Sequence, residues 1–271
     1  MTHRPKKSLG QHFLRSKSAL NAIIASGKVS AADTILEIGP GEGVLTHALL
    51  ETGAIVVAVE FDHALIPVLA ERFTQEISSG QLQLIESDIL KWSPGDHGLR
   101  AGKYKLVANI PYYITGAIFE KFLTEEHPPS CMVVLIQKEV ATRIVARDGK
   151  ESILSLSVKA FGTPKITAKV PASAFRPAPK VDSAILLVEH ISLKNFLEDG
   201  RVAPGAIEWF FKIVRAGFAH KRKMLARNLE DAAKKEDIVS AFETLGLSLK
   251  ARAEDIPLPA WFSLVSKLKN K

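Results

Sequence analysis

The sequence of residues 34–43 reads Thr34-Ile-Leu-Glu-Ile-Gly-Pro-Gly-Glu-Gly43, an apolar run that ends in a glycine-rich turn. A short apolar run bounded by glycines predicts a buried strand. The glycines have no side chains, so a ligand can approach the backbone closely at this turn. A further apolar segment at residues 44–50 predicts a helix, and the three pieces together form the first unit of an α/β fold.

The alternation of strand and helix continues through the following hundred residues. Alternating strands and helices predict a parallel sheet covered on both faces, so we expect a doubly wound, Rossmann-like α/β fold. Strands are expected at 55–59, 82–85, 106–108 and 132–136, and helices at 17–27, 63–77, 115–123, 139–147 and 153–161.

Two strands in direct succession, 165–170 and 183–189, close the α/β region. Their succession breaks the alternation and predicts an antiparallel strand at one edge of the sheet. Residues 192–205 contain glycine, proline and acidic residues in the pattern of a linker. We therefore expect an α/β domain at 1–191, a linker at 192–205 and a small all-helical domain at 206–271.

The composition is that of a globular protein from a reducing compartment. Of 271 residues, 46% are hydrophobic and 24% are charged, which is enough for a full-sized core. The single cysteine, Cys131, excludes a disulfide framework and a zinc site, and we expect no metal. No apolar run approaches the ~20 residues of a membrane span, and no signal-peptide core is present. We expect a cytoplasmic protein without membrane contact.

Basic residues are concentrated at both ends of the chain. Residues 1–28 hold six Lys and Arg and no acid, and residues 210–271 hold 13 Lys and Arg against 7 Asp and Glu. The net charge is +7, so the middle of the chain is slightly acidic. Basic flanks predict contact with a polyanion such as a nucleic acid, and a merely solvated basic arm is the alternative.

Carboxylates follow three of the expected strands. Glu37 ends the first strand beside Gly39 and Gly41, Glu60 ends the second, and Asp88 follows the third. Glu60 lies 21 residues after Gly39, the spacing at which a carboxylate accepts hydrogen bonds from a ribose diol. Asp88 would accept a hydrogen bond from an adenine amine. Glu37 and Glu42, which lies in the turn, would repel a pyrophosphate. The pattern therefore favours S-adenosylmethionine over NAD, and a purely structural turn is the alternative.

A polar and aromatic turn follows the strand expected at 106–108. Asn109 offers an amide oxygen as acceptor, and Pro111 holds Ile110 extended, so the Ile110 carbonyl is left free to accept. Tyr112 can stack on a flat group placed beside these two acceptors. We expect the turn to bind a planar group with an amino substituent, and an ordinary strand-to-helix turn is the alternative.

The segment 206–229 is expected to form one amphipathic helix. From Lys212 to Arg227 its charged face is basic, which suits a phosphate backbone. A solvated charged face is the alternative. The basic residues are Lys212, Arg215, Arg222, Lys223 and Arg227.

Over nearly its whole length the chain resembles the ribosomal small-subunit RNA adenine dimethyltransferases, the KsgA-type (RsmA) family. Its motifs occur in the order found in that family, and together they are very specific. They are Leu9-Gly-Gln-His-Phe-Leu14, Glu37-Ile-Gly-Pro-Gly-Glu-Gly43, Glu60, Asp88, Asn109-Ile-Pro-Tyr112 and Phe175-Arg-Pro-Ala-Pro-Lys-Val-Asp-Ser183.

The resemblance implies roles for the residues of these motifs. Asn109 would touch both cofactor and substrate, and Tyr112 and Phe175 would stack on opposite faces of the target adenine, next to Ile110 and Pro111. Many family members carry asparagine where this chain has His12. The residues implied to bind S-adenosylmethionine are Gln11, His12, Leu14, Gly39, Gly41, Glu60, Asp88 and Asn109.

The resemblance also implies a substrate. It is a hairpin loop near the 3′ end of small-subunit (16S) ribosomal RNA, in a pre-30S-like assembly particle, where two adjacent adenosines each receive two methyl groups. We expect the enzyme to act as a monomer.

Two alternatives stand beside this interpretation. One is a sister enzyme that dimethylates large-subunit RNA and confers macrolide resistance, against which the compact helical ending and the segment Arg252-Ala-Glu-Asp255 argue. The other is a non-catalytic RNA-binding assembly factor on the same fold, against which the intact motif at residues 109–112 argues.

Overall fold

The computed structural model of the protein describes residues 11–146 and 149–269. The basic residues Arg4, Lys6 and Lys7, and Leu9 of the first motif, lie outside the described residues. The chain divides into two compact units. The α/β unit comprises Met1–Ala141 and Gly162–Ile191, and the helical unit comprises Thr142–Phe161 and Ser192–Lys271.

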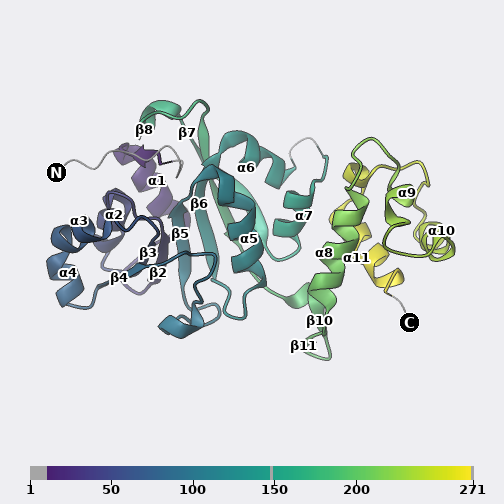
Figure 1. Ribbon diagram of the computed structural model, residues 1–271, viewed down its shortest axis with the longest axis horizontal. Coiled ribbons are helices and arrows are strands. Elements are labelled where there is room, and N and C mark those ends of the chain that lie inside the picture. Colours follow the sequence, from purple (N-terminus) through teal and green to yellow (C-terminus); the bar gives the residue numbers. More distant parts are fainter. Residues whose placement is uncertain (1–10, 147–148, 270–271) are drawn as a thin grey trace. The chain divides into compact units, whose positions relative to one another are not determined.

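The α/β unit is built on one mixed sheet (Figure 1). Among the described residues, seven strands pair in the order β4 (Leu82–Glu86), β3 (Ile55–Glu60), β2 (Thr34–Ile38), β5 (Lys105–Asn109), β6 (Cys131–Gln137), β9 (Ser183–Glu189) and β7 (Thr163–Val170). Neighbours from β4 to β6 are parallel, whereas β9 is antiparallel to both β6 and β7. The predicted Rossmann-like class is confirmed, and the antiparallel strand lies one place in from the edge.

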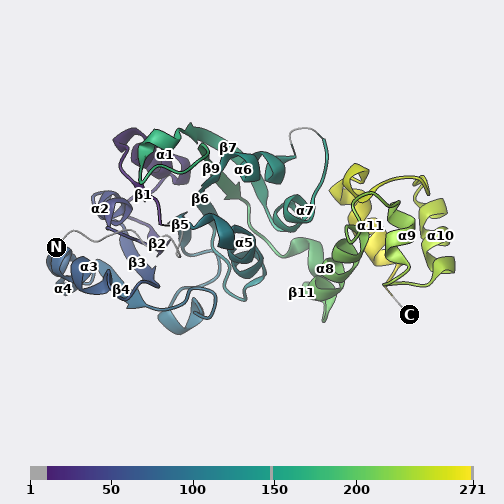
Figure 2. The same ribbon diagram turned by 45° about the horizontal axis from the view of Figure 1, so that its top comes forward.

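Helices cover both faces of this sheet (Figure 2). The helices α1 (Lys17–Gly27), α2 (Val44–Leu50) and α3 (Ile66–Arg72) share a buried apolar cluster with alternate strand residues such as Val107 and Val133. Helix α5 (Thr115–Thr124) lies on the other side of the sheet. The intervening strand residues are buried as well, as in parallel strands that are covered on both faces.

The helix predicted at 63–77 is broken into α3 and α4 (Thr74–Ser78). Phe73 between them has a non-helical backbone, with φ −112° and ψ 31°, and its ring is buried. A Cβ atom on Gly43 would lie 2.6 Å from Cε2 of this ring. The break therefore lets Phe73 pack directly against the glycine-rich turn, a long-range contact that hydrophobic periodicity does not reveal.

The helical unit has an aromatic core. The rings of Phe161 and Phe196 stack with centroids 4.8 Å apart, and Phe196 meets Phe210 edge to face at 5.5 Å. No helix in the described part of the chain is long and apolar enough to cross a membrane. The helices are α7 (Ile153–Lys159), α8 (Ala206–Gly217), α9 (Leu225–Leu229), α10 (Lys235–Thr244) and α11 (Leu258–Lys267), while α6 (Lys138–Val145) spans the boundary between the units.

Residues 192–205 are more ordered than the linker expected there. After a 3₁₀ turn that ends at Phe196, β10 (Leu197–Glu198) and β11 (Arg201–Val202) pair as an antiparallel hairpin. Phe196 is buried in the aromatic core of the helical unit. This stretch and residues 142–161 therefore group by contact with the helical unit, which differs from the boundaries expected from the sequence.

The single helix predicted at 206–229 is wrong, because α8 ends at Gly217 and α9 begins at Leu225. The side-chain amide of the buried Asn228 donates to the Gly217 carbonyl at 2.6 Å and to the His220 carbonyl at 3.2 Å. A Cβ atom on Gly217 would also lie 2.5 Å from the Trp261 ring. These contacts close the chain into a loop at residues 218–224, so the basic residues there are not part of a helix face.

Candidate active site

A cavity of about 300 Å³ opens at the carboxyl ends of the parallel strands. It lies where β2 has β3 on one side and β5 on the other, the position at which open α/β sheets bind ligands. Its lining comprises residues 11–14, 37–42, 44–45, 59–61, 87–90 and 109–114. All the residues predicted to bind the cofactor are brought together here, as are Ile110, Pro111 and Tyr112.

The glycine-rich turn brings bare backbone to the wall of the cavity. Gly39 has φ 64° and Gly41 has φ 60°, a left-handed conformation that other residues adopt only with strain. A Cβ atom on Gly41 would lie 3.0 Å from the ring of Phe13. The turn therefore depends on glycine for its conformation at both positions and for space at the second.

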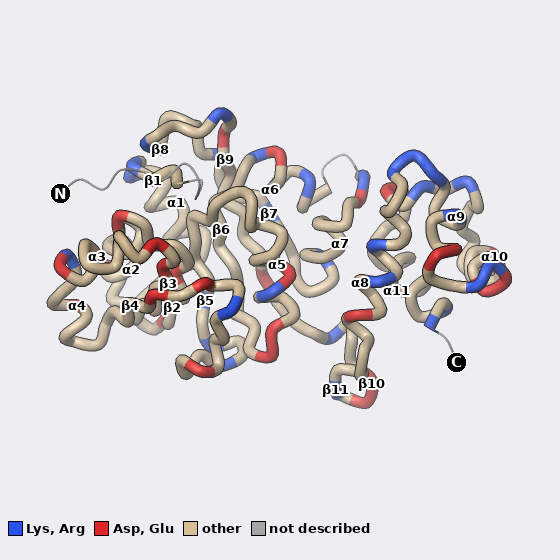
Figure 3. Tube along the Cα trace, in the orientation of Figure 1, with Lys and Arg blue, Asp and Glu red and all other residues tan. Residues whose placement is uncertain are grey.

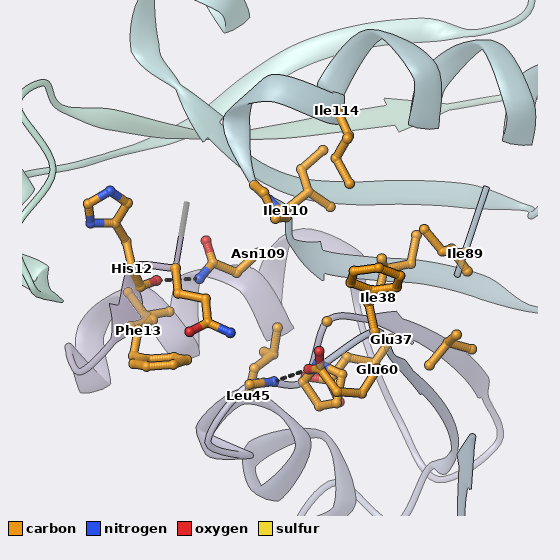
Figure 4. Close-up of a pocket in the computed structure, with 18 of the residues that line it drawn as sticks. His12, Phe13, Glu37, Ile38, Leu45, Glu60, Ile89, Asn109, Ile110 and Ile114 are labelled. Atoms are coloured by element: carbon orange, nitrogen blue, oxygen red, sulfur yellow. Dashed lines mark hydrogen bonds between the residues drawn. The ribbon is translucent and has the colours of Figure 1, made fainter. Parts of the chain in front are cut away.

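Glu60 connects the end of β3 to this turn (Figure 4). Its Oε2 accepts the Gly41 N–H at 3.0 Å, and its Oε1 accepts the Asp62 N–H at 2.7 Å. Burial raises the pKa of the Glu60 carboxyl, and the two N–H donors oppose that rise. The carboxylate is thus held in one orientation at the cavity wall, with lone pairs that could still accept from a diol.

Asp88 stands at the end of β4 and shapes the next loop. Its Oδ1 accepts the Leu90 N–H at 3.0 Å, and its carbonyl accepts the Lys91 and Trp92 N–H groups. The residue lines the cavity together with Ile89. One carboxyl oxygen of Asp88 therefore accepts a hydrogen bond within the loop, and the residue also lines the cavity.

Glu37 is the most enclosed acid of the site, with 1% of its surface exposed. Neither carboxyl oxygen meets the geometry of a hydrogen bond in the described part of the chain, although the Thr46 hydroxyl lies beside the carboxyl. Burial raises the pKa of the Glu37 carboxyl to about 8, the Thr46 hydroxyl opposes the rise, and the nearby charge of Glu60 adds to it. Sequence reasoning grouped Glu37 with the other acids but gave it no partner, because burial of this kind is not visible in the chain.

Asn109 lies at the end of β5, beside the cavity (Figure 4). Its Nδ2 donates to the His12 carbonyl at 3.1 Å. Among the described residues, nothing donates a hydrogen bond to its Oδ1. The amide therefore presents an acceptor, as the sequence predicted, and its orientation is set by the chain segment around His12.

Residues 11–15, here called the strap, run across the cavity. The β1 strand (Phe13–Leu14) pairs antiparallel with β8 (Phe175–Arg176), and the Arg15 N–H donates to the Ala174 carbonyl at 2.8 Å. Further strap contacts join Gln11 Nε2 to Asp62 Oδ2 at 2.9 Å, His12 Nδ1 to the Pro177 carbonyl at 2.8 Å, and the Arg15 guanidinium to the Glu42 carboxylate.

Phe175 is not brought to the cavity, contrary to the stacking role implied for it. It pairs with Leu14 across the two short strands, is 5% exposed, and belongs to the apolar cluster beneath the sheet. The β8 pairing directs Phe175 inward, whereas Arg176 is exposed. The ring near Tyr112 is that of His12, with centroids 6.1 Å apart and planes 22° from parallel.

Sequence reasoning missed most of the apolar lining. Phe13, Ile38, Leu45, Ile89 and Ile114 complete the walls of the cavity. Three of them could have been found, because Phe13, Ile38 and Ile89 directly follow residues that were singled out. Leu45 depends on the approach of α2, which only the fold shows.

The predicted basic residues are all exposed and lie in the helical unit. Lys212 and Arg215 are on α8, Arg222 and Lys223 are in the loop after it, and Arg227 is on α9. Figure 3 shows Lys and Arg gathered along the chain between α8 and α9, and Asp and Glu gathered near β2 and β3. The basic C-terminal region expected from the sequence is therefore present in the helical unit.

Comparisons with known proteins agree with the motifs. The family model for ribosomal RNA adenine dimethylase matches residues 2–270. A ribosomal RNA small subunit methyltransferase A from Dehalococcoides mccartyi is 40% identical over 96% of this chain and 87% of its own length. The protein of the same name from Acaryochloris marina is 37% identical over 96% of each chain.

Solved structures share the fold. A dimethyladenosine transferase from Plasmodium falciparum superposes with a TM-score of 0.76 and 26% identity, over 93% of this chain and 96% of its own. The 23S rRNA methyltransferase ErmE has a TM-score of 0.70 at 24% identity, over 95% of this chain and 100% of its own. The likeness to ErmE supports the fold alone.

The high pKa of Glu37 predicts a pH-dependent stability difference. The pKa of about 8 in the folded protein lies above the ordinary 4.5, so wild-type stability falls as pH rises between these values. Glu37→Gln cannot titrate. The free energy of unfolding of Glu37→Gln relative to wild type should rise from pH 5 to about pH 8 and then level off, as measured by denaturant titration.

The matched control is Glu71→Gln on the exposed side of α3. Its stability difference from wild type should stay flat over the same interval. A flat difference for Glu37→Gln as well would contradict the raised pKa.

Proposed function

The chain belongs to the ribosomal RNA adenine dimethylase family, and from this membership we propose that it dimethylates two adjacent adenosines in a hairpin loop near the 3′ end of small-subunit ribosomal RNA. S-adenosylmethionine is the proposed methyl donor. The observation that carries the proposal is the Asn109 amide, whose oxygen is left as an acceptor at a cavity that the carboxyl groups of Glu37, Glu60 and Asp88 also line.

The cavity residues fit this cofactor. Its positive charge and ammonium group would find the buried Glu37 carboxyl, whose oxygens have no partner among the described residues. Glu60 would accept from the ribose, Asp88 from the adenine amine, and the turn at Gly39 and Gly41 would allow close approach. Gln11, His12 and Leu14 of the strap would cover the bound molecule.

Asn109 and Ile110 would prepare the target nitrogen. The exocyclic nitrogen of adenine is a weak nucleophile because its lone pair is delocalised into the ring. If Asn109 Oδ1 and the Ile110 carbonyl accept its two hydrogens, the nitrogen can become pyramidal and direct the lone pair outward. The bound cofactor supplies a methyl group activated by its sulfonium, so the residues contribute mainly orientation and electrostatics.

No strong general base is required for the transfer. The methylated nitrogen carries a positive charge, and its proton is acidic enough to leave to water. For a second methylation only one hydrogen remains, and the first methyl group must be accommodated. The apolar side chains of Ile110 and Ile114 at the cavity offer a surface for it.

Tyr112 would stack on the target base, which must be turned out of its RNA context to reach the cavity. The exposed basic residues of the helical unit would contact phosphates. The substrate would be a small-subunit assembly particle and the enzyme a monomer in the cytoplasm. The relatives that are small subunit methyltransferases support the small subunit over the large one.

Incubation with labelled S-adenosylmethionine tests the substrate. We expect label in unmodified small subunits, recovered as dimethyladenosine, and none in large-subunit RNA or DNA. Label confined to large-subunit RNA would favour the macrolide-resistance alternative. Binding to small subunits without label would favour a non-catalytic assembly factor.

Asn109→Ala removes the amide oxygen that would accept a hydrogen bond from the adenine amine. The other residues proposed to contact the cofactor are unchanged. We expect turnover to fall about 100-fold or more, the scale of removing one preorganised polar group from an active site. Cofactor affinity, measured by calorimetry, should fall much less. The control is Asn195→Ala, which removes an amide bonded to the Ala160 carbonyl in the helical unit. Full turnover of Asn109→Ala would refute its role.

The loop after α8 should contribute electrostatically to RNA affinity. Arg222→Glu with Lys223→Glu should weaken binding and lower the salt dependence, by about one unit of slope per lost phosphate contact. Lys234→Glu with Lys235→Glu, equally exposed and near α10, is the charge-matched control. Equal binding and salt slope in both variants would identify the loop as a solvated surface.

A further inference from the structure

Tyr112 is hydrogen-bonded to a serine that the proposed chemistry does not use. The Tyr112 hydroxyl and Ser183 Oγ share a hydrogen bond of 2.8 Å, although the two residues are 71 positions apart. The Tyr112 side chain lines the cavity, whereas Ser183 is completely buried. Burial also raises the pKa of the Tyr112 hydroxyl, so the group stays protonated and can donate. This bond links the aromatic wall of the cavity to the sheet.

Ser183 is a rigid attachment point. It is the first residue of β9, in register with Gln137 on β6 and with Val170 on β7. Its predecessor, Asp182, is bonded twice, because its carbonyl accepts the Lys138 N–H and its Oδ1 accepts the Ala172 N–H at 3.1 Å. The Ser183 backbone is therefore fixed by strands on both sides.

The segment that carries Tyr112 is less constrained. Tyr112 begins a single 3₁₀ turn that ends at Ile114, after Pro111. Within this segment its carbonyl accepts the Thr115 hydroxyl at 3.0 Å. The ring itself faces the His12 ring of the strap. The hydroxyl bond is the contact that ties the far end of the ring to the sheet.

We propose that Ser183 is a positioning residue that holds the Tyr112 ring in the plane that receives the target adenine. The inference rests on the proposed function of Tyr112. A flat base stacks well only on a ring whose plane is fixed, and a hydrogen bond at the para position opposes tilting of that ring. Phe175 is buried in the core and does not offer a second ring to the base. The orientation of the Tyr112 ring therefore matters more than it would if two rings held the base.

Two single variants remove this bond and keep the ring. Ser183→Ala and Tyr112→Phe should each lower kcat/KM for small subunits about fivefold, the factor that corresponds to one neutral hydrogen bond of ~1 kcal/mol. The double variant should lose no more than either single variant, because all three lack the same bond. A product of the two single losses in the double variant would overturn the pairing.

The product ratio separates positioning from a general loss of structure. A base held less firmly leaves more often after its first methylation, so monomethyladenosine should accumulate relative to dimethyladenosine in all three variants, as measured by mass spectrometry. The ratio is compared at equal total methyl incorporation, where a smaller number of active molecules would leave it unchanged. An unchanged ratio would therefore overturn the inference.

Controls separate this inference from the proposed function. Ser157→Ala removes another buried serine hydroxyl, bonded to the Ile153 carbonyl in the helical unit, and should leave the ratio at the wild-type value. If Ser183→Ala fails to fold, Tyr112→Phe carries the same prediction. Absence of methylation by the wild-type protein would refute the proposed function itself, and that result appears before any variant is compared.

Discussion

The hydrogen bond from the Asn109 amide nitrogen to the His12 carbonyl is the constraint on which the proposed chemistry depends. It uses the donor side of the amide, so the oxygen is the atom left for a substrate. Without it the amide could turn over and present N–H groups, which would repel an adenine amine. Because the carbonyl belongs to the strap, the orientation of the proposed catalytic amide is decided by a segment 97 residues away.

Much of the α/β unit could be predicted from local patterns. The segments 44–50 and 183–189 were predicted to the residue as helix and strand, because buried runs and glycine turns are local signals. The carboxyl ends of neighbouring parallel strands meet at one sheet edge, so Glu60, Asp88 and Asn109 could be expected to share a cavity before any coordinates.

The errors share one physical origin, which is contact between distant segments. Phe175 is buried because its two-residue strand pairs with Phe13 and Leu14, and neither partner is visible in the local pattern. Helix α8 ends at Gly217, where Asn228 binds the Gly217 carbonyl and the His220 carbonyl of the following loop, although periodicity continues through the break. The raised pKa of Glu37 likewise depends on burial that the chain assembles from several elements.

The strap and the sheet of the α/β unit differ in how firmly they are held. The backbone of the strap is held by strands of two residues each, with Phe13 and Leu14 buried and polar side chains at the surface, whereas the wall behind it is a seven-stranded sheet. Segments held in this way open locally at a free energy well below that of global unfolding. Opening of the strap alone would let the proposed cofactor enter and leave without loosening the core. Substitutions that stabilise the closed strap would raise the melting temperature of the protein. The same substitutions would slow the entry and release of the cofactor, so a gain in stability at this segment would lower the turnover rate.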